Sequence, residues 1–378
     1  MILRELSSLV KEKIGRGKAI IILGARQTGK TTLVKSFLPD IPNEGLFLDA
    51  DNIEVQTLLS SPNLERLKTI IGKANLVIID EAQRIPNIGL TLKLIIDNLP
   101  TVQLLVTGSS SLELADMTNE PLTGRKWEYY MFPISWKELN DWVGYTTALL
   151  QLENRLIYGM YPEVVINAGE ERERLSVLSQ SYLYKDILSL GIVRKPEVLT
   201  KLLKALAFQV GNEVSLNELG QLVGADKVTV STYLNLLEKS FVIFRLQPLS
   251  RNLRNEISSS RKIYFYDNGI RNALINNFAP LDLRQDVGAL WENFMISERL
   301  KVNHYRKRWV TTYFWRTQAQ QEIDYVEEID GQFEAFEFKW KKQNPVKLPA
   351  QFSEAYKPLD YHVITKDNFD AFLLPQFL

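Results

Sequence analysis

The sequence predicts an α/β protein whose first part is a parallel sheet covered by helices on both faces. Short, β-branched apolar runs alternate with stretches of helical spacing as far as about residue 145, and this alternation is typical of a parallel sheet. At 378 residues, the chain is long enough for two or three domains. We expect strands in this part at 19–23, 46–49, 76–79, 103–107 and 129–134, and helices between them, including 91–98.

A glycine-rich turn follows the first predicted strand. It reads Gly24-Ala-Arg-Gln-Thr-Gly29-Lys30-Thr31 and fits G-x-x-x-x-G-K-[ST], a loop whose backbone N–H groups bind phosphate. Lys30 can reach the β- and γ-phosphates, and the Thr31 hydroxyl can bind Mg²⁺. The alternative is a plain glycine turn between a strand and a helix. The predicted nucleotide-binding residues here are Gly24, Ala25, Arg26, Gln27, Thr28, Gly29, Lys30, Thr31 and Thr32.

A second apolar run, at 76–79, ends in two adjacent carboxylates, Asp80 and Glu81. Ligands bind at the carboxyl ends of strands in open parallel sheets. Asp80 is therefore predicted to hold the Mg²⁺ that accompanies ATP, and Glu81 to orient and deprotonate the attacking water. The alternative is a solvated Asp-Glu cap at the end of the strand.

Two more positions are candidates for a role at the nucleotide. Thr107, Ser109 and Ser110 follow the strand at 103–107, where a polar side chain can sense the γ-phosphate. Ser109 is counted with the nucleotide-binding residues, although a Thr-Gly-Ser turn with serine capping explains the pattern equally well. Arg125 is a candidate catalytic arginine, acting in its own subunit, in a neighbour's, or not at all as a solvated cation.

Residues 149–210 have apolar positions at helical spacing, and 213–249 resemble a winged helix-turn-helix. Ser215 and Glu218 form a capping-box pattern, Gly224 breaks the first helix, and Asp226 caps a second helix from Lys227 to Lys239. The second helix would offer polar side chains to a DNA groove. Residues 238–262 carry six Lys or Arg and two Glu, which adds a basic stretch. Packing or protein contact is the competing interpretation.

The last region has a pattern of acidic and basic residues on predicted strands. Strand alternation sends Glu337 and Lys339 to one face and Phe336, Phe338 and Trp340 to the other. Asp324 lies on a neighbouring strand, and Glu292 on the preceding helix at 288–300. Asp…Glu-x-Lys with a helix Glu is the PD-(D/E)XK nuclease arrangement, in which carboxylates hold Mg²⁺ or Mn²⁺. A salt-bridged strand in an inactive relative is the alternative. Basic residues that could contact a phosphate backbone lie nearby, at Arg306, Lys307, Arg308, Arg316, Lys341 and Lys342.

Composition narrows the choices further. The net charge is +0, so any nucleic-acid surface has to be a local patch. The chain has no cysteine and two histidines, which excludes disulfides, thiolate metal sites and histidine-rich metal sites and is consistent with the cytoplasm. No apolar run reaches 18 residues, so no membrane span is expected, and there is no signal-peptide pattern.

The order of these motifs resembles the bacterial and archaeal AAA+-type ATPases (P-loop, AAA_14-like) that carry a C-terminal domain of unknown function, DUF4143. The matching segments cover essentially the whole chain: GARQTGKTT (24–32), LVIIDEAQRIPN (76–87), LLVTGSSS (104–111), LTGRKWEYYMFPISWKEL (122–139), GMYPEVV (159–165), KIYFYDNGIRNAL (262–274), WENF, YFWRTQAQQEIDYVEE and EFKW. One departure is Gln320-Gln321, where the family usually has a glycine. The resemblance implies ATP binding.

We therefore expect four regions: a P-loop NTPase domain at 1–145, a helical lid at 146–210, a winged helix-turn-helix at 211–260 and a restriction-endonuclease-like α/β domain at 261–378. The predicted function is Mg²⁺-dependent ATP hydrolysis coupled to double-stranded DNA. Two alternatives stay open: an ATP-switched scaffold whose inactive C-terminal domain binds protein, and a defence-type nuclease gated by ATP. The oligomeric state is left open.

Overall fold

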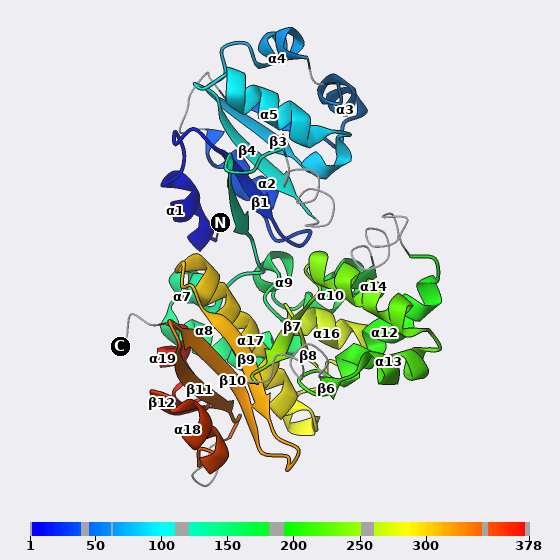
Figure 1. Ribbon diagram of the computed structural model, residues 1–378, viewed down its shortest axis with the longest axis vertical. Helices are drawn as coiled ribbons and strands as arrows, with labels where there is room; N and C mark the ends of the chain where they lie inside the picture. Colours follow the sequence, from blue (N-terminus) through cyan, green and yellow to red (C-terminus); the bar gives the residue numbers. More distant parts are fainter. Residues whose placement is uncertain are drawn as a thin grey trace. The chain divides into compact units, whose positions relative to one another are not determined.

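The computed structural model describes residues 2–38, 45–61, 63–109, 121–180, 193–250, 261–341 and 347–374. The chain forms two compact units (Figure 1). The first comprises Met1–Ile134 with Lys239–Phe241, and the second Ser135–Glu238 with Val242–Leu378. In the described ranges, no helix is both long and apolar enough to cross a bilayer.

The first unit is built on the expected parallel sheet, with strand order β2-β3-β4-β1-β5. Strand β4 lies between β3 and β1, the two strands that carry the phosphate loop and the paired carboxylates. All residues of these three strands are buried, as their continuous apolar runs predict. The strands are β1 (Ala19–Leu23), β2 (Gly45–Asp49), β3 (Leu76–Asp80), β4 (Gln103–Gly108) and β5 (Lys126–Tyr130).

The fifth strand begins and ends earlier than the 129–134 expected from the sequence. Its last ladder bond is donated by the Met131 N–H to the Leu23 carbonyl at 2.7 Å. Pro133 has no N–H to continue the ladder, so the chain leaves the sheet there. The helices of this unit are α1 (Glu5–Lys11), α2 (Lys30–Lys35), α3 (Ile53–Leu59), α4 (Leu64–Ile71), the short 3₁₀ turn η2 (Ala82–Arg84) and α5 (Ile88–Asn98).

The second unit begins with helices, as the spacing at 149–210 predicts. Helix α7 starts with a complete capping box between Ser135 and Glu138. The helices are α7 (Trp136–Val143), α8 (Tyr145–Tyr158), α9 (Pro162–Ile166), α10 (Glu171–Gln180), α12 (Pro196–Phe208), α13 (Leu216–Val223), α14 (Lys227–Lys239), α16 (Asn268–Leu274), η4 (Leu281–Leu283), α17 (Val287–Tyr305), α18 (Ala350–Tyr356) and α19 (Phe369–Leu373).

A single seven-stranded sheet runs through this unit in the order β12-β11-β10-β9-β7-β8-β6. It joins the strands around the helix-turn-helix to those of the C-terminal region, because β7 pairs in parallel with β9. Strand β8, which the sequence places in the C-terminal domain, pairs with β6 and β7. The strands are β6 (Glu213–Val214), β7 (Ile243–Pro248), β8 (Arg261–Phe265), β9 (Thr311–Arg316), β10 (Glu322–Ile329), β11 (Gln332–Phe338) and β12 (Asp360–Ile364).

The turn between β9 and β10 explains the departure noted at Gln320-Gln321. Gln320 has φ of 63°, in the left-handed region that glycine adopts readily. Its N–H donates to the Thr317 carbonyl at 2.9 Å, and the Thr317 N–H donates to the Gln321 carbonyl at 2.9 Å. The turn therefore keeps a conformation suited to glycine, although a glutamine occupies the position.

Candidate functional sites

The two glycines of the phosphate loop serve different purposes. Gly29 caps α2 with φ of 96°, a left-handed conformation that a side chain would strain. Gly24 is needed because the chain passes close by: a Cβ at this position would lie 2.2 Å from the Met131 carbonyl oxygen. The loop therefore fits closely against the segment after β5 before it turns into α2.

Lys30 lies across the phosphate loop. Its ammonium donates to the Gly24 and Ala25 carbonyls, both at 2.9 Å, and the side chain is buried. The Thr28 hydroxyl also donates to the Ala25 carbonyl, at 2.8 Å. The positive charge is thus held against the loop predicted to wrap the phosphates.

Asp80, at the end of β3, accepts hydrogen bonds from two hydroxyls. Thr31 of α2 donates to its Oδ2 at 2.7 Å, and Thr107 of β4 donates to its Oδ1. The donor set, a threonine hydroxyl beside a carboxylate, suits Mg²⁺ with a nucleotide. The sequence predicts that Thr31 and Asp80 hold the same Mg²⁺. The structure adds Thr107, whose hydroxyl fixes the second carboxylate oxygen of Asp80.

Glu81 follows with φ of 52°, and its backbone N–H donates to the Thr107 hydroxyl at 3.0 Å. Its Oε2 accepts from the Gln83 amide at 2.6 Å, and the same amide donates to the Ser109 hydroxyl at 2.9 Å. Burial by itself raises the pKa of Glu81, but the Lys30 charge and these hydrogen bonds bring that pKa below its usual value. The carboxylate is therefore ionised near neutral pH, as a general base has to be.

Ser109 thus contacts Gln83, while Thr107 contacts both acidic residues, and Ser110 lies outside the described residues. Gln83 was not singled out from the sequence. Its position two residues after Glu81 carries no distinctive pattern, and its role depends on β4, which is far away in the chain.

Arg4 is a second residue that sequence reasoning missed. Its guanidinium donates to the Thr28 carbonyl of the phosphate loop at 2.5 Å and to the Phe132 carbonyl at 2.7 Å. It therefore ties the loop to the segment after β5. No local motif marks Arg4, because its partners lie 24 and 128 residues away along the chain.

Arg125 lies near the amino-terminal ends of the strands, whereas the phosphate loop lies at their carboxyl-terminal ends. It immediately precedes β5, whose first residue pairs with Ala19 at the start of β1, whereas the loop follows the end of β1. Its guanidinium pairs with Asp97 of α5 at 2.7 Å and is 40 % exposed. A role at the nucleotide of its own chain does not follow from this placement, and a role in a neighbouring subunit stays a prediction.

The helix-turn-helix pattern corresponds to α13 and α14, flanked by β6 and β7. Ser215 accepts from the Glu218 N–H at 3.1 Å, and Asp226 accepts from the Thr229 N–H at 2.9 Å. On α14, Lys227, Thr232 and Asn235 are exposed and Thr229 and Ser231 half-buried. The predicted basic stretch is partly engaged elsewhere: Arg245 pairs with Glu238 and Asn235, Lys262 is buried, and Arg251 and Arg254 lie outside the described residues.

The four residues of the predicted nuclease-like site lie in one region. Asp324 Oδ2 accepts from the Phe338 N–H at 2.8 Å, which joins β10 to β11 beside Glu337. Lys339 donates to Glu337 Oε1 at 2.6 Å, so the predicted alternation places these two together. Glu292 of α17 accepts from the Tyr264 hydroxyl at 2.6 Å. The charge of Asp324 acts on both Glu292 and Glu337.

A fifth charged residue, Lys262 of β8, lies among these carboxylates. Its ammonium pairs with Glu292 at 3.1 Å and with Glu322 at 2.5 Å. Burial lowers the pKa of Lys262, but the charges of Glu292 and Asp324 outweigh burial and raise that pKa above its usual value. We call Lys262, Glu292, Asp324, Glu337 and Lys339 the carboxylate cluster.

The carboxylates of the cluster hold protons unusually strongly. Burial first, and the Asp324 charge second, raise the pKa of Glu292 to about 7. Burial also raises the pKa of Asp324, and burial with the Asp324 charge raises that of Glu337. Each cause disfavours another negative charge in the same enclosed space.

The cluster does not fit a divalent metal as it stands. Among the described residues, no three Asp, Glu, His or Cys side chains converge to hold a metal ion. Lys262 and Lys339 already occupy oxygens of Glu292 and Glu337. The opposing observation is Glu337 Oε2, which is buried with no partner in the described part of the chain.

A cleft of about 680 Å³ opens beside the cluster. Glu292 and Lys339 line it, with Trp340, Lys341 and Lys366 on the same side as Lys339. Trp340 packs against Trp291 with ring centres 5.3 Å apart, as the predicted packing face suggests, and because β11 ends at Phe338 it also lines the cleft. Another part of the lining, the 280–288 segment, contributes Pro280, Leu281, Asp282, Arg284, Val287 and Gly288.

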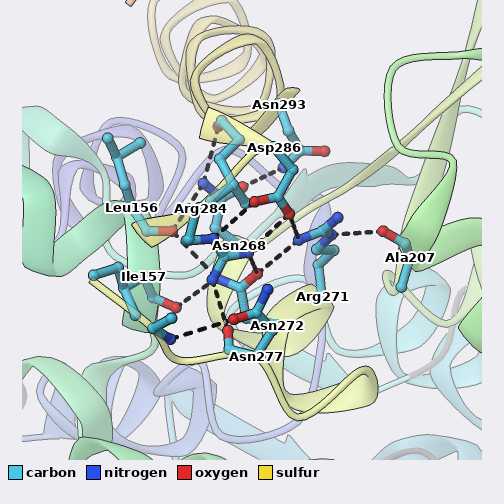
Figure 2. Close-up of polar contacts among 12 residues, drawn as sticks. Leu156, Ile157, Ala207, Asn268, Arg271, Asn272, Asn277, Arg284, Asp286 and Asn293 are labelled. Carbon is cyan, nitrogen blue, oxygen red and sulfur yellow. Dashed lines mark hydrogen bonds and ion pairs between the residues drawn. The ribbon is translucent and has the colours of Figure 1, made fainter. Parts of the chain in front are cut away.

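A buried polar network anchors the 280–288 segment (Figure 2). Arg284 pairs with Asp286 at 2.8 Å and donates to the Asn277 carbonyl at 2.7 Å, while Arg271 pairs with Asp286 at 2.5 Å. Burial raises the pKa of Asp286, but the two arginines lower it to about 2. The network fixes the start of α17 and hence the position of Glu292 one and a half turns later.

The network also accounts for the segment KIYFYDNGIRNAL. Asn268 donates to the Leu290 carbonyl at 3.0 Å, Asn272 donates to the Ile157 carbonyl at 2.7 Å, and Asn293 donates to Asn268 Oδ1 at 2.7 Å (Figure 2). Upstream in the same segment, Lys262 and Tyr264 contact Glu292. One stretch of sequence therefore builds both the cluster and the wall of the cleft.

Three family models each match a part of this chain. Residues 16–140 match a family described as an AAA domain, residues 149–281 a domain of unknown function (DUF8612) and residues 287–372 a domain of unknown function (DUF4143). The P-loop geometry and the first match define an AAA-like P-loop ATPase domain, followed by a DUF4143 domain.

Individual relatives have been named only as uncharacterized proteins. One from Mycobacterium tuberculosis is 28% identical over 342 residues, covering 89% of this chain and 73% of the relative. One from Haemophilus influenzae is 23% identical, covering 66% and 68%. Among solved structures, the Walker-type ATPase of Pyrococcus abyssi matches with a TM-score of 0.53 and 17% identity, covering 73% of this chain and 96% of that one, and this shows a shared fold.

We expect Arg4→Met to destabilise the first unit. The change leaves the Thr28 and Phe132 carbonyls without their buried donor, which costs on the order of 1–3 kcal/mol. Thermal and urea unfolding of the full chain measures the effect, with Arg16→Met, an exposed arginine nearby, as the matched control. Equal unfolding curves for the two variants would show that Arg4 does not brace the loop.

The raised pKa of Glu292 predicts a pH-dependent stability. The folded protein keeps a proton between the ordinary value of 4.5 and about 7, where the unfolded chain has lost it, so the stability supplied by this group falls as pH rises through that window. Glu292→Gln cannot lose a proton, so its melting temperature relative to the wild type should rise from about pH 5 to about pH 8. Asp282→Asn, which changes an exposed carboxylate of the 280–288 segment, is the control. A difference that does not change with pH contradicts the prediction.

Proposed function

We propose that the first unit binds Mg-ATP and hydrolyses it. The observation that carries the proposal is the arrangement around Asp80: hydroxyls from α2 and β4 hold its two oxygens, Lys30 crosses the adjacent loop, and Glu81 follows as a half-buried, ionised carboxylate. The phosphates would contact Lys30, the Mg²⁺ would contact Asp80 and the attacking water would contact Glu81, all at the carboxyl ends of the strands.

Each side chain then has a distinct task. The loop from Gly24 to Thr32 would surround the phosphates, and Lys30 would exchange its two carbonyl contacts for phosphate oxygens. Thr31 and Asp80 would hold Mg²⁺, which when bound neutralises charge on the phosphates. Glu81 would accept a proton from the attacking water. Gln83, itself held by Ser109, would orient the Glu81 carboxylate.

We also propose that the second unit engages double-stranded DNA, with β6, α13, α14 and β7 acting as a winged helix-turn-helix. The exposed polar residues along α14 support this, as do the lysines lining the cleft. The competing function is an ATP-switched scaffold in which the same surfaces bind protein. Its support is that Arg245 and Lys262 are engaged internally.

Paired variants test the ATPase. Lys30→Ala removes the charge-assisted phosphate contact and should weaken ATP binding at least about tenfold, while Glu81→Gln should keep ATP binding and slow hydrolysis about a hundredfold or more. Lys35→Ala, an exposed lysine on the same helix, is the control. Calorimetry with ATP and a phosphate-release assay measure the two effects. ATP affinity unchanged in folded Lys30→Ala would sink the proposal for the loop, and equal turnover in Glu81→Gln would remove Glu81 as the base.

A salt series tests the DNA proposal. Affinity for duplex DNA should fall steeply between about 50 and 200 mM salt, because bound lysines and arginines release counterions. Lys227→Glu, at the start of α14, should weaken binding further, whereas Lys73→Glu, an exposed lysine of the first unit, should not. No binding at low salt, with and without ATP, would favour the scaffold.

A further inference from the structure

Lys262 is an unusual residue to find inside an acidic cluster. Its side chain is 2% exposed, and its ammonium reaches Glu292 of α17 and Glu322 of β10. The ammonium also lies 5.6 Å from the centre of the Phe314 ring of β9, which covers it on another side. Elements far apart in sequence thus converge on one buried positive charge.

The charges of the cluster nearly balance without any added ion. Glu292, Asp324 and Glu337 carry up to three negative charges, and Lys262 and Lys339 carry two positive ones. A proton can offset the remaining negative charge, since burial and the Asp324 charge both raise the pKa of Glu292. Glu322, the other partner of Lys262, is also within 3.8 Å of Arg316.

We propose that the Lys262 ammonium takes the place of a divalent cation in the carboxylate cluster, so that the cleft beside it binds its ligand without a metal and does not cut DNA. The ammonium already lies against oxygens of Glu292 and Glu322, and a divalent ion beside it would meet a like charge in an enclosed space. The unpartnered Glu337 Oε2 remains as an acceptor for a donor of the incoming ligand.

This inference is independent of ATP hydrolysis, because it concerns the second unit alone. It chooses between two interpretations of the acidic pattern: a metal-dependent nuclease, and an inactive relative that binds a ligand without cutting DNA. It also explains why a lysine stands at the start of KIYFYDNGIRNAL, where Lys262 points inward rather than to solvent.

The test is Mn²⁺ binding to the nucleotide-free full chain, followed by electron paramagnetic resonance. All proteins carry Asp80→Asn, so that the carboxylate of the first unit does not contribute. The parent protein should bind no Mn²⁺ at the cluster. Lys262→Met should bind one Mn²⁺ at least about tenfold more tightly than the parent, because the competing charge is gone, and Lys262→Arg, which keeps the charge, should not.

Two further measurements cover a variant that folds poorly. Lys262→Met leaves buried carboxylates without their counter-ion, so Mn²⁺ should raise its melting temperature while leaving that of the parent unchanged. Adding Glu337→Gln to Lys262→Met should abolish that rise. Tight Mn²⁺ binding by the parent that Glu337→Gln removes, or Mn²⁺-dependent cleavage of DNA by the wild type, would overturn the proposal. Failure of Mn²⁺ to bind or stabilise Lys262→Met would overturn it as well.

Discussion

The carboxylate of Asp80 is the point on which the first unit depends. One oxygen is held by Thr31, at the start of the helix after the phosphate loop, and the other by Thr107, at the end of the neighbouring strand. Thr107 also accepts the N–H of Glu81. A buried carboxylate has to be paired or hydrogen-bonded, so these contacts fix the relative positions of the loop, both strand ends and the second acidic residue.

The rest of the first unit supports this arrangement from behind. Gly24 lets the loop approach the segment after β5, and Arg4 joins the same two segments through their carbonyls. The loop is therefore held against this segment by contacts within the protein itself. Preorganisation of this kind reduces the cost of ordering a site when its ligand binds.

The second unit follows a comparable logic around α17. Arg271, Arg284 and Asp286 fix the beginning of the helix (Figure 2). Lys262 and Tyr264 contact Glu292 further along it. Residues from both anchored regions line the cleft. The ammonium groups of Lys262 and Lys339 contact the carboxylates of Glu292 and Glu337 beside it.

Residues that belong to a recognisable motif could be predicted even where the fold brings them together, as with Thr31 and Asp80, and residues outside any motif could not. Spacing alone placed Lys30, Thr31 and Asp80, and strand alternation correctly joined Glu337 with Lys339. Arg4, Gln83 and Lys262 were missed as site residues because no motif marks them. The Thr28 partner of Arg4 is 24 residues away, the Glu292 partner of Lys262 is 30 residues away, and Gln83 also contacts Ser109, 26 residues away. Arg125 was a candidate by residue type, but because β5 is parallel to β1, Arg125 lies at the strand ends opposite the phosphate loop.

The most direct test of the account is the turnover of Thr107→Val. Valine keeps the volume but removes the hydroxyl that holds Asp80 and receives the Glu81 N–H. Steady-state hydrolysis with a Mg²⁺ titration should show kcat reduced about 10- to 100-fold, as expected for losing a hydrogen bond to a charged group, while ATP still binds. A folded Thr107→Val protein with wild-type kcat would contradict the claim that the position of Asp80 organises the site.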